Sequence, residues 1–185
     1  MKKIMILNGA GRRNGNTAEL IKAFTEGAQS VGNEVREFYL QTMNIHGCID
    51  CQGCARANAD ANNPCVQKDD MAQIYEAYLW CDVIVFASPI YWFTITGTLK
   101  TAVDRLYAIQ RKLGLDHSSR ETALILTAGG DDFSQPIEWY SKFEKWMKWK
   151  NWGIVTATGK SYYNPDGKNP PEKVEEARKL GASIH

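Results

Sequence analysis

Glycine residues and polar side chains that could bind a phosphate group follow the first apolar segment of the chain. In the stretch ILNGAGRRNGNTAEL, Gly9, Gly11 and Gly15 precede Asn16 and Thr17. A phosphate accepts hydrogen bonds from main-chain N–H groups at the start of a helix, and glycine lets the main chain approach it closely. Asn16 and Thr17 add side-chain donors at the first helical turn. The pattern therefore predicts a phosphate site between a strand and a helix.

Other interpretations of this glycine-rich segment differ in the ligand. A P-loop requires Gly-Lys followed by Ser or Thr, whereas the chain has Gly15-Asn16-Thr17, so no lysine is placed to reach a triphosphate. A dinucleotide-binding loop is an alternative, because the pattern misses G-x-G-x-x-G by one residue and Glu37 lies about where a ribose-binding acid would. A plain strand-to-helix turn is another. The hydroxyl and amide donors at the helix start favour a terminal monophosphate.

Two later segments carry groups that suit a flat ring. In SPIYWFTITGTLK, Pro89 to Phe93 place three aromatic side chains in a row, which is costly unless they line a flat ligand. In TAGGDD, Gly129 and Gly130 let the main chain approach a ring edge. Together with the phosphate segment, these features outline a mononucleotide with a large planar ring, which indicates FMN. Core or dimer packing is the alternative for any one aromatic residue taken alone.

Four of the five cysteines form a dense cluster. Cys48, Cys51, Cys54 and Cys65 have the spacing C-x2-C-x2-C-x10-C. Thiolates at this spacing can bind an iron–sulfur cluster, because a tight loop directs them at one centre, and four thiolates can also bind zinc. The preferred interpretation is four thiols without a metal, with a [4Fe–4S] cluster and zinc as alternatives. Cys81, at the start of a strand, is expected to be a buried apolar residue.

Apolar segments that alternate with segments of helical period predict the sheet that positions these groups. The nearly apolar first, third and fourth segments are expected inside the sheet, and the more polar second and fifth at its edges. This favours an α/β, flavodoxin-like, doubly wound parallel sheet of order 2-1-3-4-5, with helices on both faces and the ligand at the carboxyl ends of the strands. The five predicted strands are Lys3 to Asn8, Glu34 to Leu40, Val83 to Ser88, Thr122 to Ala128 and Gly153 to Ala157.

Helices are expected between these strands, and one long segment has no convincing period. One clear helical pattern directly follows the glycine-rich segment. Three further helical patterns cover Thr96 to Lys112, Gln135 to Trp149 and Pro171 to Gly181. Asp69 or Asp70 is expected to cap a further helix. Residues 41–68 contain the four clustered cysteines, and so long an irregular segment is usually functional or metal-bound. We therefore predict one domain over residues 1–185, with a cysteine-bearing loop at 41–68.

Composition limits the classes of function. The chain has 185 residues, with 22 basic and 21 acidic side chains and a formal net charge of +1. This balance predicts neither nucleic acid nor a membrane surface as a partner. No secretory signal is recognised, and no segment approaches the ~20 apolar residues of a membrane span. A cytoplasmic protein with reduced cysteines that acts on a small molecule is therefore expected.

The motifs resemble those of the flavodoxin-like NAD(P)H-dependent FMN reductase family over nearly the whole chain. The segments that carry the resemblance are GAGRRNGNT, CVQKDDM, SPIYWFTITGTLKTAVDR and TAGG. The resemblance implies that Arg12, Asn16 and Thr17 bind the FMN phosphate, that Pro89 to Phe93 line the isoalloxazine and that Thr127 to Gly130 flank it. The full set of expected FMN contacts is Gly9, Ala10, Gly11, Arg12, Gly15, Asn16, Thr17, Pro89, Ile90, Tyr91, Trp92, Phe93, Thr127, Ala128, Gly129 and Gly130.

The chain departs from the family pattern at two places. Ala10 and Gly11 replace the usual serine and proline, so one hydroxyl ligand is missing and main-chain N–H groups are expected to compensate, with somewhat weaker retention of FMN. The last cysteine gap is longer than in the iron–sulfur flavoproteins, which are relatives of this family. The resemblance also implies a homodimer through the helix that carries Lys100, Asp104 and Arg105, for which a solvated face with ordinary ion pairs is the alternative.

The resulting hypothesis is an FMN-dependent NAD(P)H oxidoreductase. Hydride would pass from the nicotinamide to bound FMN and on to a quinone, a flavin or a similar small acceptor. The chemistry would belong to the cofactor, so no catalytic side chain is named. The alternative is an electron-transfer flavoprotein, with a possible [4Fe–4S] cluster at Cys48, Cys51, Cys54 and Cys65.

Overall fold

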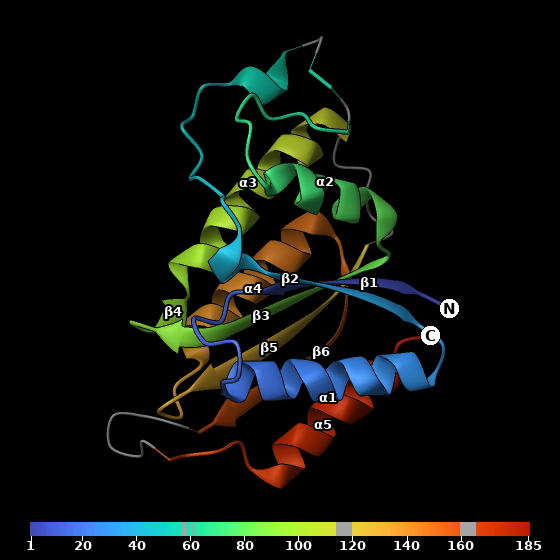
Figure 1. Ribbon diagram of the computed structural model, residues 1–185, viewed down its shortest axis with the longest axis vertical. Helices are drawn as coiled ribbons and strands as arrows, with labels where there is room; N and C mark the ends of the chain where they lie inside the picture. The colour runs from blue at the N-terminus through green and yellow to red at the C-terminus, as the bar shows by residue number, and fades with distance from the viewer. Residues whose placement is uncertain (57–58, 61, 114–119, 160–165) are drawn as a thin grey trace.

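The computed structural model of the protein describes residues 1–56, 59–60, 62–113, 120–159 and 166–185 (Figure 1). In these residues, five parallel strands form a sheet in the order β2-β1-β3-β5-β6. A short strand, β4, pairs antiparallel with the end of β3. The predicted order 2-1-3-4-5 is therefore confirmed, with β4 inserted in the numbering. The strands are β1 (Lys3–Asn8), β2 (Glu34–Tyr39), β3 (Val83–Tyr91), β4 (Thr94–Ile95), β5 (Glu121–Ala128) and β6 (Lys150–Thr158).

The burial of each strand follows its polarity. Leu7, Phe86 and Leu124, from β1, β3 and β5, are fully buried at the centre of the sheet. In contrast, β2 and β6 keep exposed residues along much of their length and form the two edges. Central parallel strands are covered on both faces, so they tolerate few polar side chains, and this is why the sequence predicted their order.

Helices cover both faces of the sheet, as predicted. On one face, below the sheet in Figure 1, lie α1 (Asn16–Ser30) and α5 (Pro171–Ala182). On the other face lie α2 (Met71–Trp80), α3 (Gly97–Leu113) and α4 (Ser134–Met147), which share a second core with the sheet. Each helix packs an apolar stripe on the strands, which is the main source of helix stability in a domain of this kind.

Two strands are longer by several residues than the sequence predicted. The third predicted strand ended at Ser88, but β3 continues to Tyr91 because Ile90 and Tyr91 pair with β4. Trp92 and Phe93 form the two-residue turn of this hairpin, with φ of 48° and 66°. The last predicted strand began at Gly153, whereas β6 begins at Lys150 and has a register shift against β5.

The cysteine-bearing segment is anchored at its base and not free. It begins with the short helix η1 (Leu40–Thr42) and contains a second, η2 (Gly53–Ala55). The N–H of Asn44 donates to Asp70 over 2.7 Å, and the N–H of Asp70 donates to the Asn44 carbonyl over 3.0 Å. Further along the loop, the Gln67 side chain donates to the Gly47 carbonyl over 3.1 Å and joins the two ends of the segment. The loop therefore has a hydrogen-bonded base beside α2 and α3, above the sheet in Figure 1.

Within the described residues, no helix has the length and apolar character that crossing a membrane requires.

Helices α1 and α5 approach closely because glycine occupies both sides of their contact. A Cβ atom at Gly181 would lie 2.0 Å from the Phe24 carbonyl oxygen, and one at Gly27 would lie 1.9 Å from the Arg178 carbonyl oxygen. Both neighbours are main-chain atoms, so a side chain at either position can be accommodated only if the helices separate.

We predict that Gly181→Ala lowers the free energy of unfolding by about 3 kcal/mol, because the added methyl group forces α5 away from α1. Denaturant unfolding followed by circular dichroism measures this loss. Gly97→Ala is the matched control, since the Cβ it adds would have no heavy atom within 4 Å from the described residues outside its chain neighbours and its own helix main chain. Equal stabilities for the two variants would contradict the close helix contact.

Candidate functional site

The carboxyl ends of three neighbouring strands line one cavity. Its volume is about 80 Å³, and it lies where β1, β3 and β5 end, at the left of the sheet in Figure 1. The order of the sheet reverses direction at β1 and β3, which is where ligands of doubly wound folds bind. The structure thus brings together most of the predicted site. The lining residues are Ala10, Gly11, Arg12, Gly15, Asn16, Thr17, Pro89, Ile90, Tyr91, Thr127, Ala128 and Gly129.

The loop after β1 is held by buried hydrogen bonds. Asn8 is buried, accepts from the N–H of Ala10 over 2.9 Å and donates to Glu37 over 2.7 Å. Gly9 donates its N–H to the Ala87 carbonyl over 2.8 Å and accepts from the Thr96 hydroxyl over 2.9 Å. Glu37, which could have bound a ribose in a dinucleotide site, is thus engaged with Asn8 and does not line this cavity.

The start of α1 supplies donors at one end of the cavity. The first N–H groups of a helix have no carbonyl partner within the helix, so those of Asn16 and Thr17 can serve a ligand. A Cβ atom at Gly15 would lie 3.5 Å from Nε of Arg12, which places this cationic side chain at the same helix end. The helix dipole and the guanidinium both favour an anion here.

The polar side chains of Asn16 and Thr17 already have protein partners. The Thr17 and Thr127 hydroxyls lie 2.7 Å apart and join α1 to the end of β5. Nδ2 of Asn16 donates to the Gly167 carbonyl over 3.3 Å. The sequence predicted these side chains as phosphate donors, whereas in the structure the main-chain N–H groups are the donors without a helical partner.

The aromatic side chains after β3 are not all in the cavity. Tyr91 lines it, and its hydroxyl would lie 3.1 Å from a Cβ atom at Gly11. Trp92 and Phe93 are at the tip of the hairpin, with exposed fractions of 92% and 66%. Neither they nor Gly9 and Gly130 are among the lining residues. Contacts of these four with a cofactor remain predictions.

The clustered cysteines line a second cavity, of about 60 Å³, between the cysteine loop and α3. Asp50 and Gln52, on either side of Cys51, have positive φ angles of 50° and 56°. Such strained main chain is common at functional sites. Burial raises the pKa of the Cys54 thiol, and its three neighbouring thiols raise it further. The four cysteines that line this cavity are Cys48, Cys51, Cys54 and Cys65.

The described residues hold no group of three or more His, Cys, Asp or Glu side chains that could bind one metal ion. A single zinc ion would need the four thiols to converge within its coordination sphere. An iron–sulfur cluster spaces its thiolates more widely, because each binds a different iron atom. The four cysteines line one cavity, and the cluster and zinc both stay alternatives to four free thiols.

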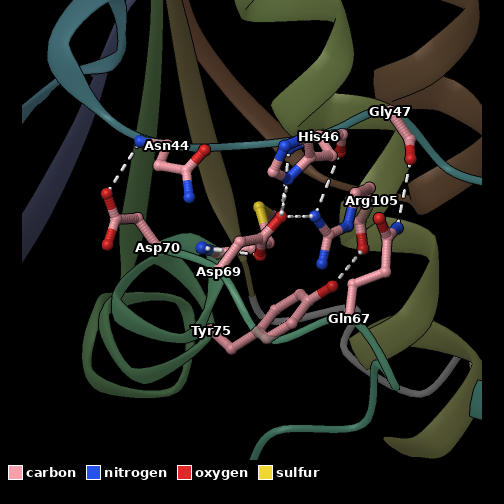
Figure 2. A network of polar contacts seen from close by, with 9 residues as sticks. Asn44, His46, Gly47, Gln67, Asp69, Asp70, Tyr75 and Arg105 are labelled. Carbon is pink, nitrogen blue, oxygen red and sulfur yellow. Dashed lines mark hydrogen bonds and ion pairs between the residues drawn. The ribbon is translucent and has the colours of Figure 1, made fainter.

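Arg105 lies at the base of the cysteine loop and is buried, with an exposed fraction of 2% (Figure 2). Its Nη1 donates to the Asp69 carboxylate and, over 3.0 Å, to the His46 carbonyl. Tyr75 donates its hydroxyl to the Arg105 carbonyl over 3.0 Å. The solvated face is wrong for Arg105, because the cysteine loop and α2 cover it within one chain. A dimer interface through this helix stays a prediction. Lys100 and Asp104 do form an exposed ion pair.

Charge and hydrogen bonding keep the Arg105–Asp69 pair ionised. Burial disfavours the charged carboxylate, but hydrogen bonds from Arg105 and from the N–H groups of His46 and Met71 outweigh it and lower the pKa of Asp69. Burial likewise disfavours the charged guanidinium, but the bond to Asp69 outweighs it and raises the pKa of Arg105. Asp69 also accepts from the first N–H of α2 over 3.2 Å, so the predicted capping role is confirmed.

Sequence reasoning missed this ion pair. An arginine at the end of LKTAVDR and an acid in CVQKDDM were both in view, but a helical arginine usually faces solvent. The signal in the sequence was the pair of apolar residues Ala102 and Leu106, which lie close to Arg105 on the same helix and are buried in the structure. They indicated that this helix is buried on more than one side.

The sheet order and the cavity at the switch point define a flavodoxin-like α/β protein. The chain belongs to the NADPH-dependent FMN reductase family, whose model matches residues 2–135. Members of this family bind FMN and use NAD(P)H.

Curated relatives fall into two groups. An iron–sulfur flavoprotein of Methanocaldococcus jannaschii is 37% identical over 81 residues, which cover 44% of this chain and 39% of that protein. YwqN of Bacillus subtilis, named as a candidate NAD(P)H-dependent FMN-containing oxidoreductase, is 32% identical over 134 residues, which cover 70% of this chain and 68% of YwqN. The chain spans less than half the length of the first curated relatives it matches.

Solved structures share the fold along the whole chain. An NAD(P)H:quinone oxidoreductase from Methanothermobacter marburgensis superimposes with a TM-score of 0.69 at 17% identity, covering 100% of this chain and 99% of that chain. At such identity the likeness shows the fold alone.

We predict that Asp69→Asn lowers the free energy of unfolding at pH 7 by about 3–5 kcal/mol, because it leaves the buried Arg105 charge unpaired. The folded-state pKa of Asp69 lies below its ordinary value of 3.8. The stabilisation is therefore complete above about pH 5 and is lost as the pH falls through the folded-state pKa.

Denaturant unfolding at a series of pH values measures the difference between the wild type and Asp69→Asn, which should shrink toward acid. The matched control is Asp70→Asn, because the Asp70 carboxylate accepts exposed hydrogen bonds from Asn44 and Gln73. A difference that does not depend on pH would contradict the ionised pair.

Proposed function

We propose that this protein is an FMN-dependent NAD(P)H oxidoreductase that passes electrons to a quinone, a flavin or a similar small acceptor. The observation that carries the proposal is the single cavity formed by three strand ends, with helix N–H groups and Arg12 at one end and glycine main chain at the other. Membership of the FMN reductase family supports it. The FMN-containing oxidoreductase and quinone oxidoreductase among the similar proteins agree with the proposed class of reaction.

The residues present fit the two ends of FMN. The N–H groups at the start of α1 and the Arg12 guanidinium suit the phosphate, which carries negative charge at neutral pH. Ala10 lines the cavity but lacks the hydroxyl that the family pattern has there. Bound FMN would supply the chemistry by accepting a hydride from NAD(P)H and passing the electrons on.

The protein would orient and enclose the ring. Pro89 and Ile90 form one wall, and the Tyr91 side chain reaches across toward Gly11. Main-chain groups near Ile90 and Gly129, which line the cavity, would hydrogen-bond a ring edge. Because donor and acceptor would use the same open side in turn, steady-state kinetics should give parallel lines for the two substrates.

A homodimer is part of this proposal. An apolar groove of about 250 Å³ runs between α3 and α4, next to the exposed Tyr107 and Trp146. Exposed aromatic side chains beside an apolar groove are typical of interaction surfaces. Sedimentation of the purified protein tests the dimer, and Trp146→Asp should shift it toward the monomer.

We predict that Arg12→Ala weakens FMN binding by about 10–100-fold, because one charge-assisted hydrogen bond to phosphate is lost. Titration of the apoprotein with FMN, followed by quenching of flavin fluorescence, measures the dissociation constant. Arg13→Ala is the control of matched charge: the Arg13 guanidinium stacks 4.6 Å from the Tyr39 ring and does not line the cavity. Equal losses in both variants would indicate general electrostatics and not a phosphate site.

The function itself is tested by anaerobic reduction of the purified protein. The FMN-loaded protein should be yellow and should bleach rapidly on addition of NADH or NADPH, and an added quinone should restore the colour. A protein that binds FMN but resists both nucleotides would instead be an electron carrier. A colourless protein that ignores added FMN would refute the proposal.

A second candidate function is an electron-transfer flavoprotein with a [4Fe–4S] cluster. The specific observation that favours it is the second cavity, which all four clustered cysteines line together with the buried Arg105. The cluster would be held by Cys48, Cys51, Cys54 and Cys65 and would add one-electron transfer to the two-electron chemistry of FMN. Several curated relatives are named iron–sulfur flavoproteins, which supports this candidate.

Iron and sulfide analysis of anaerobically purified protein tests the second candidate. About four iron atoms per chain are expected if the cluster is present. Cys54→Ser should remove most of this iron, whereas Cys81→Ser should not, because Cys81 is buried at the end of α2. Iron-free wild-type protein after reconstitution with ferrous iron and sulfide would exclude the cluster.

A further inference from the structure

The guanidinium of Arg105 has hydrogen-bonding capacity that its protein partners do not use. Nη1 alone serves both Asp69 and the His46 carbonyl. Within the part of the chain that the structure describes, Nε and Nη2 of Arg105 are buried and have no hydrogen-bond partner. Buried N–H groups of a charged side chain are rarely left without an acceptor, because their desolvation is then uncompensated. The Cys65 sulfur lies close enough to help raise the pKa of Arg105, so these two donors indicate an acceptor on the thiol side of the guanidinium.

The cysteine cavity offers a site for such an acceptor, because Arg105 lines that cavity together with the four thiols and Tyr75. The other side of Arg105 is closed by the Asp69 and His46 contacts seen in Figure 2. The ion pair with Asp69 also fixes the direction of the side chain from α3 toward the loop. The site thus combines a permanent positive charge, two free donors and four potential thiolates around one small volume.

We propose that Nε–H and Nη2–H of Arg105 donate hydrogen bonds to sulfur atoms of a [4Fe–4S] cluster held by the four clustered cysteines, and that Arg105 is the residue that positions this cluster and raises its reduction potential. The inference rests on the second candidate function. It adds a residue that is not a ligand and that no cysteine pattern identifies.

Charge explains the expected effect on the potential. A doubly positive cluster core with four thiolates carries two net negative charges, and uptake of one electron adds a third. A cation and its N–H donors stabilise the more negative state more strongly, so they raise the reduction potential. Arginine suits this role because its planar guanidinium offers donors on several edges, so one edge can serve Asp69 while another serves sulfur.

Two variants with opposite expectations test the proposal in the full-length protein reconstituted anaerobically with ferrous iron and sulfide. Arg105→Lys keeps the positive charge but loses the planar guanidinium and its two free N–H donors. This variant should bind the cluster with a lower midpoint potential, and the electron paramagnetic resonance spectrum of its dithionite-reduced state should change. Asp69→Asn keeps both free donors and removes a nearby negative charge, so its potential should equal or exceed that of the wild type. Both variants should lose stability.

Thermal unfolding of each variant separates positioning from a purely structural role. If both potentials shift in the same direction, in proportion to the loss of stability, Arg105 only supports the loop and the proposal is overturned. An unchanged potential in Arg105→Lys also overturns it. Wild-type protein that binds no iron defeats the second candidate function, and the inference with it. Failure of the inference alone is seen when the wild type holds the cluster and Arg105→Lys has the same potential.

A measurement on the wild type keeps the test decisive if Arg105→Lys does not fold. Protein grown with guanidino-¹⁵N-arginine should show a weak nitrogen coupling in pulsed electron paramagnetic resonance of the reduced cluster. The absence of any such coupling would overturn the proposal.

Discussion

The parallel direction of the central strands is the constraint on which the rest of this structure depends. Because β1, β3 and β5 run the same way, the chain must leave all three at one edge of the sheet and return over a helix. Segments that are far apart in sequence, around Gly11, Tyr91 and Gly129, therefore meet at a single cavity. The cavity exists because of this geometry, and its lining side chains are added to it.

A buried ion pair has a comparable role for the cysteine loop. The loop has little regular structure of its own, so its position depends on contacts at its base. Arg105 connects α3 to Asp69 at the start of α2 and to the His46 carbonyl in the loop, so one guanidinium joins three segments. A buried pair is costly to desolvate, and its value here is better understood as positional specificity than as net stability.

The two cavities lie in different parts of the molecule and differ in construction. The first cavity is formed by main-chain groups at strand ends, together with glycine residues and Arg12. The second is built from side chains on an irregular loop against α3, and it depends on strained main chain at Asp50 and Gln52.

The sequence by itself determined the sheet order and the three segments of the first cavity. Central strands need apolar residues, and turns that let the main chain approach a ligand need glycine, so both can be recognised from residues close together in the sequence. It could not predict the β3–β4 hairpin, in which Trp92 and Phe93 adopt positive φ angles that glycine or asparagine usually fills. Nor could it place Arg105, whose burial is decided by packing of the cysteine loop and α2 over α3. Only the tertiary structure decided these features, because they depend on contacts between residues distant in sequence.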